Sequence, residues 1–288
     1  MNKYLLIAGL LLALGLTGCD KPAQEQAKPA DTPSQPASTE TRQEDDNAAP
    51  TAEEIAALAE ADKAEDVAKP LSIMLLYDVD EPGVDPYQSR MIITEDFIRL
   101  DEKNDTNDFV LVDRKKRIVY SVSSDNDAIL VVNSAPVKVE SPIELKLDMS
   151  RTMAEGAPTI DGHILAQYVF IVNNETCQDA MIAEGLLPEA TKALSEYRHI
   201  LSGQHSSTMQ HTPADTHNGC DLSMHIFQPD RHLQFGLPIN ERDRSGYQRS
   251  LVDYDDDYEV NTKLFELPGE FGRFTIDDLN AGNPPVTE

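Results

Sequence analysis

Hydrophobic and polar residues alternate along short segments in the first half of the chain, and turn-forming residues separate these segments. Arg99, for example, lies between Ile98 and Leu100. Alternation with a period of two is typical of strands that have one buried and one solvated face. Because the segments are short and closely spaced, they predict an antiparallel meander. Its strands are expected at 71–78, 89–94, 97–101, 109–113, 117–123 and 128–133, continued at 143–149 and 164–172.

The pattern changes at Leu187-Pro188-Glu189, where a proline suits the first position of a helix. Apolar residues then recur at helical spacing, which predicts a helix that ends at about Leu201. The residues of this apolar stripe are Ala190, Leu194, Tyr197 and Leu201. Further strands are expected at 222–227, 232–236, 247–253 and 258–265. The pattern therefore predicts one mainly β (α+β) domain over residues 70–280, with one principal helix and a flexible tail at 281–288.

Residues 19–69 have a different composition, rich in Ala, Pro, Gln, Glu, Asp and Thr and free of aromatic residues. Such a segment buries too little apolar surface to offset the entropy lost on ordering. We therefore expect a disordered acidic tether.

The first 18 residues have the layout of a secretory signal peptide: Lys3, an apolar run from Leu5 to Leu16, and two small residues before Cys19. The run is too short to span a membrane, which takes about 20 apolar residues. A cysteine at the cleavage point resembles the lipobox of bacterial lipoproteins. The resemblance implies that Cys19 carries the lipid (diacylglycerol and palmitate) and anchors a protein that faces the periplasm. By the same resemblance, Asp20 favours the inner over the outer membrane, although sorting positions differ between bacteria.

The net charge of −27 makes the chain a poor partner for molecules and surfaces with a dense negative charge. Nucleic acids and anionic lipid surfaces would be repelled. One dense basic run, residues 114–117, is either a contact for head groups or an acidic partner, or a solvated turn between two strands; we favour the turn.

Cysteine usage predicts one disulfide. With Cys19 assigned to lipid, Cys177 and Cys220 remain, and the periplasm is oxidising. A redox role would favour a Cys-x-x-Cys spacing, which is absent. We therefore expect a structural bridge.

Four local features, in this order, resemble bacterial lipoprotein-like domains of the LolA/LolB type. They are the meander with 97–101, 109–113 and 118–120; Asp161-Gly162 with Tyr168, followed by the helix at 187–189; Gly236-Leu237-Pro238-Ile239; and Leu264-Phe265-Glu266-Leu267-Pro268. The resemblance covers residues 71–274. It implies a half-barrel, an antiparallel sheet curled around a helix that leaves an apolar concavity. Residues 177–220 contain features outside this pattern.

Candidate chemistry is sparse. His205, His211 and His217, with Met209, Met224 and His225 nearby, suit copper or zinc by residue type, but the spacing matches no common zinc site, and we favour a loop without metal. The acidic run 253–259 lacks the spacing of a calcium loop and is expected to be a solvated strand. For the acidic run 101–108 we favour a polar hairpin turn over a cation site. Motifs for nucleophilic catalysis, phosphate cradling and dinucleotide binding are missing, so we expect neither enzymatic activity nor a cofactor.

These features predict a lipid-anchored periplasmic protein that binds an apolar or amphiphilic ligand or an envelope partner. The residues expected to face the cavity are Leu75, Met91, Ile93, Ile98, Leu100, Leu194 and Tyr197. A packed core would use the same residues, so a scaffold subunit of an envelope complex is the alternative. Copper or zinc handling by the histidine loop is a further alternative.

Overall fold

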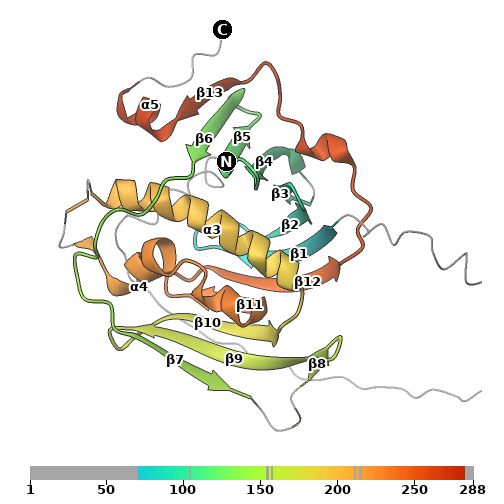
Figure 1. Cartoon of the computed structure of the whole chain (residues 1–288). Coiled ribbons are helices and arrows are strands. Elements are labelled where there is room, and N and C mark those ends of the chain that lie inside the picture. Colours follow the sequence, from blue (N-terminus) through green and yellow to red (C-terminus); the bar gives the residue numbers. More distant parts are fainter. Residues whose placement is uncertain are drawn as a thin grey trace, which may run out of the picture. The chain divides into compact units, whose positions relative to one another are not determined.

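A curled sheet with a long helix lying across it makes up the described part of the chain (Figure 1). The computed structural model describes residues 71–103, 105–153, 156, 158–210, 212–213 and 216–282. The predicted signal peptide, Cys19, Asp20 and the tether lie outside these residues, as do His211 and most of the predicted tail.

Thirteen strands form the sheet, in the order β13-β6-β5-β4-β3-β2-β1-β12-β11-β10-β9-β7, with the short β8 paired to β9. Neighbouring strands are antiparallel except for β13 and β6. The strands are β1 (Ser72–Asp80), β2 (Tyr87–Thr94), β3 (Phe97–Glu102), β4 (Asp105–Asp113), β5 (Ile118–Ser123), β6 (Ala128–Asn133), β7 (Leu147–Thr152), β8 (Thr159–Ile160), β9 (His163–Val172), β10 (Glu175–Glu184), β11 (Gly236–Asp243), β12 (Gln248–Asp255) and β13 (Gly272–Thr275).

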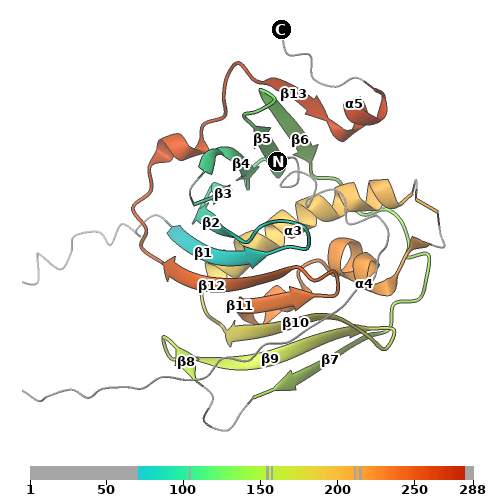
Figure 2. The same cartoon turned by 180° about the vertical axis from the view of Figure 1, so that it is seen from behind.

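The predicted fold class is confirmed. Strands β1 to β6 each pair with the next one along the chain, as a meander requires. Strand β1 also pairs with β12, and this pairing joins the first six strands to the later ones in one sheet. Seen from behind, β1 and β12 lie side by side at the middle of the sheet (Figure 2).

Three predicted strands are wrong. Residues 222–227 belong to α4 (Gly219–Leu222) and the π-helical turn η2 (Ser223–Phe227). Residues 232–236 are mainly the 3₁₀ helix η3 (Arg231–Gln234), and 258–265 contain the 3₁₀ helix η4 (Thr262–Phe265). Short apolar runs do not distinguish helix from strand by period alone. At α4 the capping side chain of Asn218, which accepts from the backbone N–H of Asp221, favours the helix.

The principal helix, α3 (Pro188–Met209), continues eight residues beyond its predicted end. Its last two turns carry small residues, which let the helix approach the chain beneath it closely. A Cβ atom added at Gly203 would lie 2.1 Å from the carbonyl oxygen of Ala135. The apolar stripe ends at Leu201 because close backbone contact replaces large side chains after that point.

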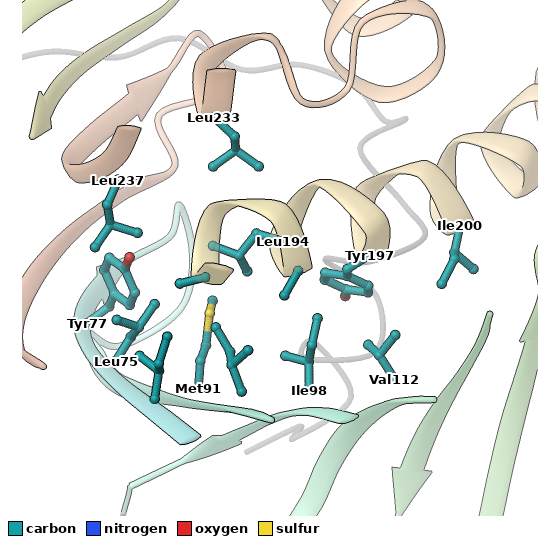
Figure 3. Close-up of a cluster of buried hydrophobic side chains, with 14 of the residues drawn as sticks. Leu75, Tyr77, Met91, Ile98, Val112, Leu194, Tyr197, Ile200, Leu233 and Leu237 are labelled. Carbon is teal, nitrogen blue, oxygen red and sulfur yellow. The ribbon is translucent and has the colours of Figure 1, made fainter. Parts of the chain in front are cut away.

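The main core lies between α3 and the concave face of β1 to β6. Figure 3 shows three α3 side chains above the sheet side chains. Those from the helix are Leu194, Tyr197 and Ile200, and those drawn from the sheet include Leu75, Tyr77, Met91, Ile98 and Val112. An ion pair also holds α3 to the sheet: Arg114, in the turn between β4 and β5, lies 2.8 Å from Glu196 of the helix.

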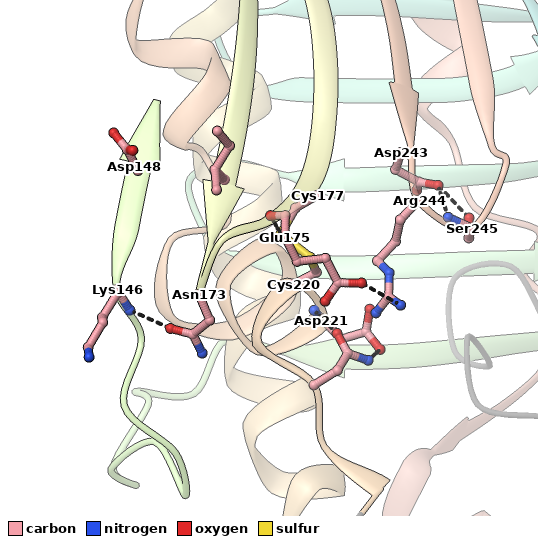
Figure 4. Close-up of a disulfide and its surroundings, with 12 residues drawn as sticks. Lys146, Asp148, Asn173, Glu175, Cys177, Cys220, Asp221, Asp243, Arg244 and Ser245 are labelled. Carbon is pink, nitrogen blue, oxygen red and sulfur yellow. Dashed lines mark hydrogen bonds and ion pairs between the residues drawn. A yellow bond between two sulfur atoms is a disulfide. The ribbon is translucent and has the colours of Figure 1, made fainter. Parts of the chain in front are cut away.

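The predicted disulfide between Cys177 and Cys220 is formed and buried, and it joins β10 to α4 (Figure 4). An ion pair between Glu175 and Arg244, 2.9 Å long, lies beside it. The disulfide holds α4 against the end of the sheet, and η2, which follows α4 directly, packs against α3.

The segment after β12 lies on the opposite face of the sheet from α3. Phe97 and Arg99 alternate with the core residue Ile98, so their side chains point away from the helix. Phe265 stacks on Phe97 with ring centroids 5.3 Å apart, and Arg99 donates to the carbonyl oxygen of Leu264 at 2.6 Å. This segment therefore covers part of the outer face on its way to β13.

Candidate ligand-binding site

Charged side chains are buried on the concave face where β10, β11 and β12 meet. Glu241 on β11 and Arg249 on β12 are 2% and 6% exposed and stand opposite each other in the strand register. Arg249 Nε lies 2.6 Å from Glu241 Oε1, and Gln178 Nε2 donates to the other carboxylate oxygen at 3.1 Å. We call Gln178, Arg198, His232, Glu241 and Arg249 the polar cluster.

His232 enters the cluster from η3 and is 3% exposed. Its Nε2 atom lies 3.6 Å from Glu241 Oε2, which is too long for a hydrogen bond, and it has no hydrogen-bond partner among the described residues. Burial, and then the charge of Arg198, lower the pKa of His232 to about 3. The ring is therefore neutral at neutral pH, with a buried nitrogen that has no partner.

Glu241 stays ionised although it is buried. Burial alone would raise its pKa, but the charge of Arg249, with smaller contributions from His232 and Arg198, lowers the pKa to about 2. Arg249 contacts the carboxylate directly at 2.6 Å, and Arg198 adds a second positive charge that acts on it from further away. The polar cluster therefore carries an excess of positive charge.

A small, partly open cavity adjoins the polar cluster. Its volume of about 10 Å³ is close to what one water molecule needs. Polar and apolar side chains line it together: Phe170, Val172, Cys177, Gln178, Arg198, Ser223, Met224, Gln228, Pro229, Arg231 and His232. Arg231 also lies over the Phe170 ring, 5.4 Å from its centroid.

The seven side chains predicted to face a ligand cavity all lie on the concave face. Six are buried in one cluster: Leu75, Met91, Ile93, Ile98, Leu194 and Tyr197. Leu100 is partly buried against that cluster. The described α3 fills the concavity, so a ligand that reaches these residues has to displace the helix.

The structure brings together a different histidine pair from the predicted trio. His205 on α3 and His225 on η2 have ring centroids 5.4 Å apart. Burial lowers the pKa of each to about 4, and for His205 the neighbouring His225 contributes next. His217 lies in the loop before α4, and His211 is outside the described residues. Among the residues that are described, no group of three or more His, Cys, Asp or Glu could hold a metal ion.

A scan of protein-family models and a search of curated proteins gave no match. Solved structures that the search found include an uncharacterised conserved protein from Thermus thermophilus, at TM-score 0.37 and 9% identity over 76% of this chain and 99% of that one. The structure of PNGF-II matches at TM-score 0.36 and 13% identity, and the match covers 74% of this chain and 32% of the PNGF-II chain. A LolA superfamily protein from Nitrosomonas europaea has TM-score 0.26 and 10% identity over 76% of this chain and 99% of its own. Likenesses this weak carry no functional information.

Within residues 71–282, as far as they are described, no helix is long and apolar enough to cross a membrane.

Proposed function

We propose that the chain is a non-enzymatic binding protein of the bacterial envelope, which takes an apolar or amphiphilic ligand between α3 and the concave face of the sheet. The observation that carries the proposal is that one helix covers a broad, apolar concave surface of an open sheet. The proposal includes the anchor at Cys19, which would hold the domain at the membrane on its periplasmic side.

Displacement of α3 is favoured by the kind of side chains that it buries. Besides Leu194, Tyr197 and Ile200, its buried residues are small or bear hydroxyl groups: Ala190, Thr191, Ala193, Ser202, Gly203 and Ser206. Burial stabilises by roughly 25 cal/mol per Å² of apolar surface, so small side chains hold the helix weakly. A ligand with an alkyl chain would cover the same sheet residues with more apolar contact.

The start of α3 is also weakly stabilised. Its N-cap residue, Leu187, has left-handed backbone angles (φ 47°) and makes no side-chain capping hydrogen bond. A missing side-chain cap costs a helix about 1 kcal/mol, and the left-handed region is uncommon for a residue such as leucine. Both features favour opening of α3 at this end.

The concave surface is divided in a way that suits an amphiphile. Beneath α3, strands β1 to β6 contribute apolar side chains, whereas β10 to β12 contribute Gln178, Glu241 and Arg249 of the polar cluster. A ligand with an alkyl chain and a polar head group would match both parts.

Binding can be tested with the neutral fluorescent probe 1-N-phenylnaphthylamine and the full chain carrying Cys19→Ala, which removes the attached lipid. We expect saturable binding with about one probe per chain, and competition by dodecanoate below its micelle concentration. In the control variants Val252→Ser and Leu279→Ser, which remove exposed apolar side chains, binding should be unchanged. Absence of saturable binding, or its loss in these two variants, would refute the proposal.

The scaffold alternative is favoured by the filled core, in which Leu75, Ile93 and Ile98 have no exposed surface. Crosslinking in the membrane fraction separates the two candidates. A protein partner captured in stoichiometric amount, together with no probe binding, would indicate a scaffold subunit.

A further inference from the structure

Arg198 is a cation without a partner of its own in the described part of the chain. It lies half-buried on α3 and forms no hydrogen bond or ion pair there. Its helix neighbours are paired, because Glu196 binds Arg114 and His199 lies 3.2 Å from Asp230. In a chain with 51 acidic and 24 basic residues, an arginine left without a carboxylate calls for an explanation.

Arg198 lines the small cavity, and its positive charge acts on several groups of the interior. It lowers the pKa values of His205, His225 and His232, for which burial is the larger cause. It also lowers the pKa of Glu241, after the larger effect of Arg249. Glu241 forms its direct ion pair with Arg249, at 2.6 Å, so within the described residues Arg198 has no carboxylate in direct contact.

Arg198 lines the small cavity together with His232, whose buried Nε2 atom has no hydrogen-bond partner. The other cavity cation, Arg231, already donates to the carbonyl oxygens of Asp148 and Ile171, at 2.7 and 3.3 Å. The guanidinium group of Arg198 and the Nε2 atom of His232 are therefore available to bind a ligand at one cavity. The volume of this cavity suits a single oxygen atom.

The polar cluster links the cavity to the apolar core. Gln178 lines the cavity and donates to Glu241, and Arg249, the ion-pair partner of Glu241, lies over the Tyr77 ring, 4.6 Å from its centroid. Tyr77 belongs to the core cluster beneath α3, so side-chain contacts connect the cavity to that apolar surface.

We propose that the ligand is an anionic amphiphile that enters where α3 opens at its start, while the turn that carries Arg198 stays in place. One carboxylate or phosphate oxygen is seated in this cavity as acceptor from Arg198, and the alkyl chain lies on the apolar side of the concave face. His232 would be a second donor in the tautomer that carries its proton on Nε2. The remainder of the head group would lie at the cavity opening, because the cavity is too small for a whole phosphate. This inference rests on the proposed function and specifies its ligand class.

The test compares three dodecyl compounds of equal chain length as competitors of bound 1-N-phenylnaphthylamine: dodecanoate, dodecyl phosphate and dodecyltrimethylammonium. We expect the two anions to displace the probe at concentrations at least about tenfold below that of the cation. Since a hydrogen bond to a charged group is worth about 1.5–3 kcal/mol, Arg198→Gln should reduce the anion preference by about tenfold or more. Arg198→Lys should keep part of it.

A matched control is Arg242→Gln, which removes an exposed arginine of β11 and should leave the preference intact. Equal displacement by anions and cation, or an unchanged preference in Arg198→Gln, would overturn the inference while the proposed function stands. Failure of the probe to bind at all would overturn the proposed function itself. A last measurement compares the shifts in thermal unfolding temperature caused by inorganic phosphate, acetate and dodecanoate. If phosphate or acetate gives as large a shift as dodecanoate, and Arg198→Gln abolishes it, the cavity is a free-anion site and the inference is overturned.

Discussion

Glu241 and Arg249 face each other across the β11–β12 hairpin, and each is buried with the other as its nearest opposite charge. Removing both charges from water is costly, so a buried pair adds little net stability. Removing one partner leaves the other charge buried and uncompensated, which is far more costly. A variant that removes one member of the pair therefore tests whether both charges are buried.

We expect Glu241→Gln to lower the free energy of unfolding by about 3–5 kcal/mol, because it leaves Arg249 buried without a counter-charge. Urea unfolding measures this change. The matched control Glu189→Gln breaks an exposed pair with Lys192 and should cost less than about 0.5 kcal/mol. Similar small losses in both variants would contradict the buried pair.

Acid should destabilise the domain through three histidines, of which His232 is buried and His205 and His225 are partly buried. The folded-state pKa values of His205 and His225 are about 4, and that of His232 is about 3, whereas the unfolded chain has a value near 6.5. The unfolded state therefore binds more protons below pH 6.5, so stability present above that pH is lost as the pH falls towards 4.

Lowering the pH from 7.5 to 5.5 should reduce the free energy of unfolding by about 1.4 kcal/mol for each histidine, because the unfolded chain binds the proton more tightly. Urea unfolding at a series of pH values measures the slope, and His232→Gln should reduce it by about one third. A stability that is flat or increases on acidification over this range would contradict the buried neutral rings.

The sequence predicted few of these interior polar residues. Paired carboxylates are so frequent in this acidic chain that Glu241 was indistinguishable from its exposed counterparts. The sequence does indicate a turn at 243–246, and a hairpin at that turn places Glu241 and Arg249 opposite each other. The inward direction of their side chains depends on the register of β11 and β12, and a bulge between Met181 and Ile182 in the neighbouring β10–β11 pairing interrupts the simple alternation.

At the scale of the element, α3 depends on a close approach of two backbones. Gly203→Ala places a methyl group 2.1 Å from the carbonyl oxygen of Ala135 and 2.8 Å from its carbon, so the helix end has to move. We expect a loss of about 1–3 kcal/mol in unfolding free energy, typical of overpacking, together with tighter binding of 1-N-phenylnaphthylamine.

Gly269→Ala is the control for this change, because the added carbon would meet no atom within 4 Å. Its stability and probe binding should stay close to those of the parent chain. If Gly203→Ala behaved as Gly269→Ala does, the approach of α3 to Ala135 would be refuted.

The disulfide holds α4 and η2, the elements beside the C-terminal half of α3. Replacing both Cys177 and Cys220 with serine should lower the free energy of unfolding by about 4 kcal/mol, the chain-entropy value for a loop of this length. Urea unfolding of the double variant and of the oxidised parent measures the difference. A loss under about 1 kcal/mol would show that the loop is not constrained by the bridge.

The start of α3 was predictable because Pro188 and the apolar stripe are local signals. Its end was not, because Ser202, Gly203 and Ser206 are buried through tertiary contact rather than by an apolar period. The same limit explains the π-helical turn at 223–227, which the residue pattern cannot distinguish from a strand.

At the scale of the whole molecule, the strand order joins two parts of the chain that are far apart in sequence. The alternation of the first six strands predicted their meander, since each pairs with its neighbour along the chain. The pairing of β1 with β12 and of β6 with β13 depends on contacts across about 140–180 residues, which periodicity does not encode. These pairings place the polar cluster beside the apolar core and so create the proposed amphiphile site.

The central claim is that an anionic amphiphile binds beneath α3. Methyl NMR of the full chain carrying Cys19→Ala, titrated with dodecanoate below its micelle concentration, tests it most directly. The account predicts that the methyl signals of Leu75, Ile93, Ile98 and Leu194 shift, while those of the exposed Val252, Ile164 and Leu279 stay unchanged. Shifts confined to the exposed methyl groups, with the core signals unmoved at saturation, would contradict it.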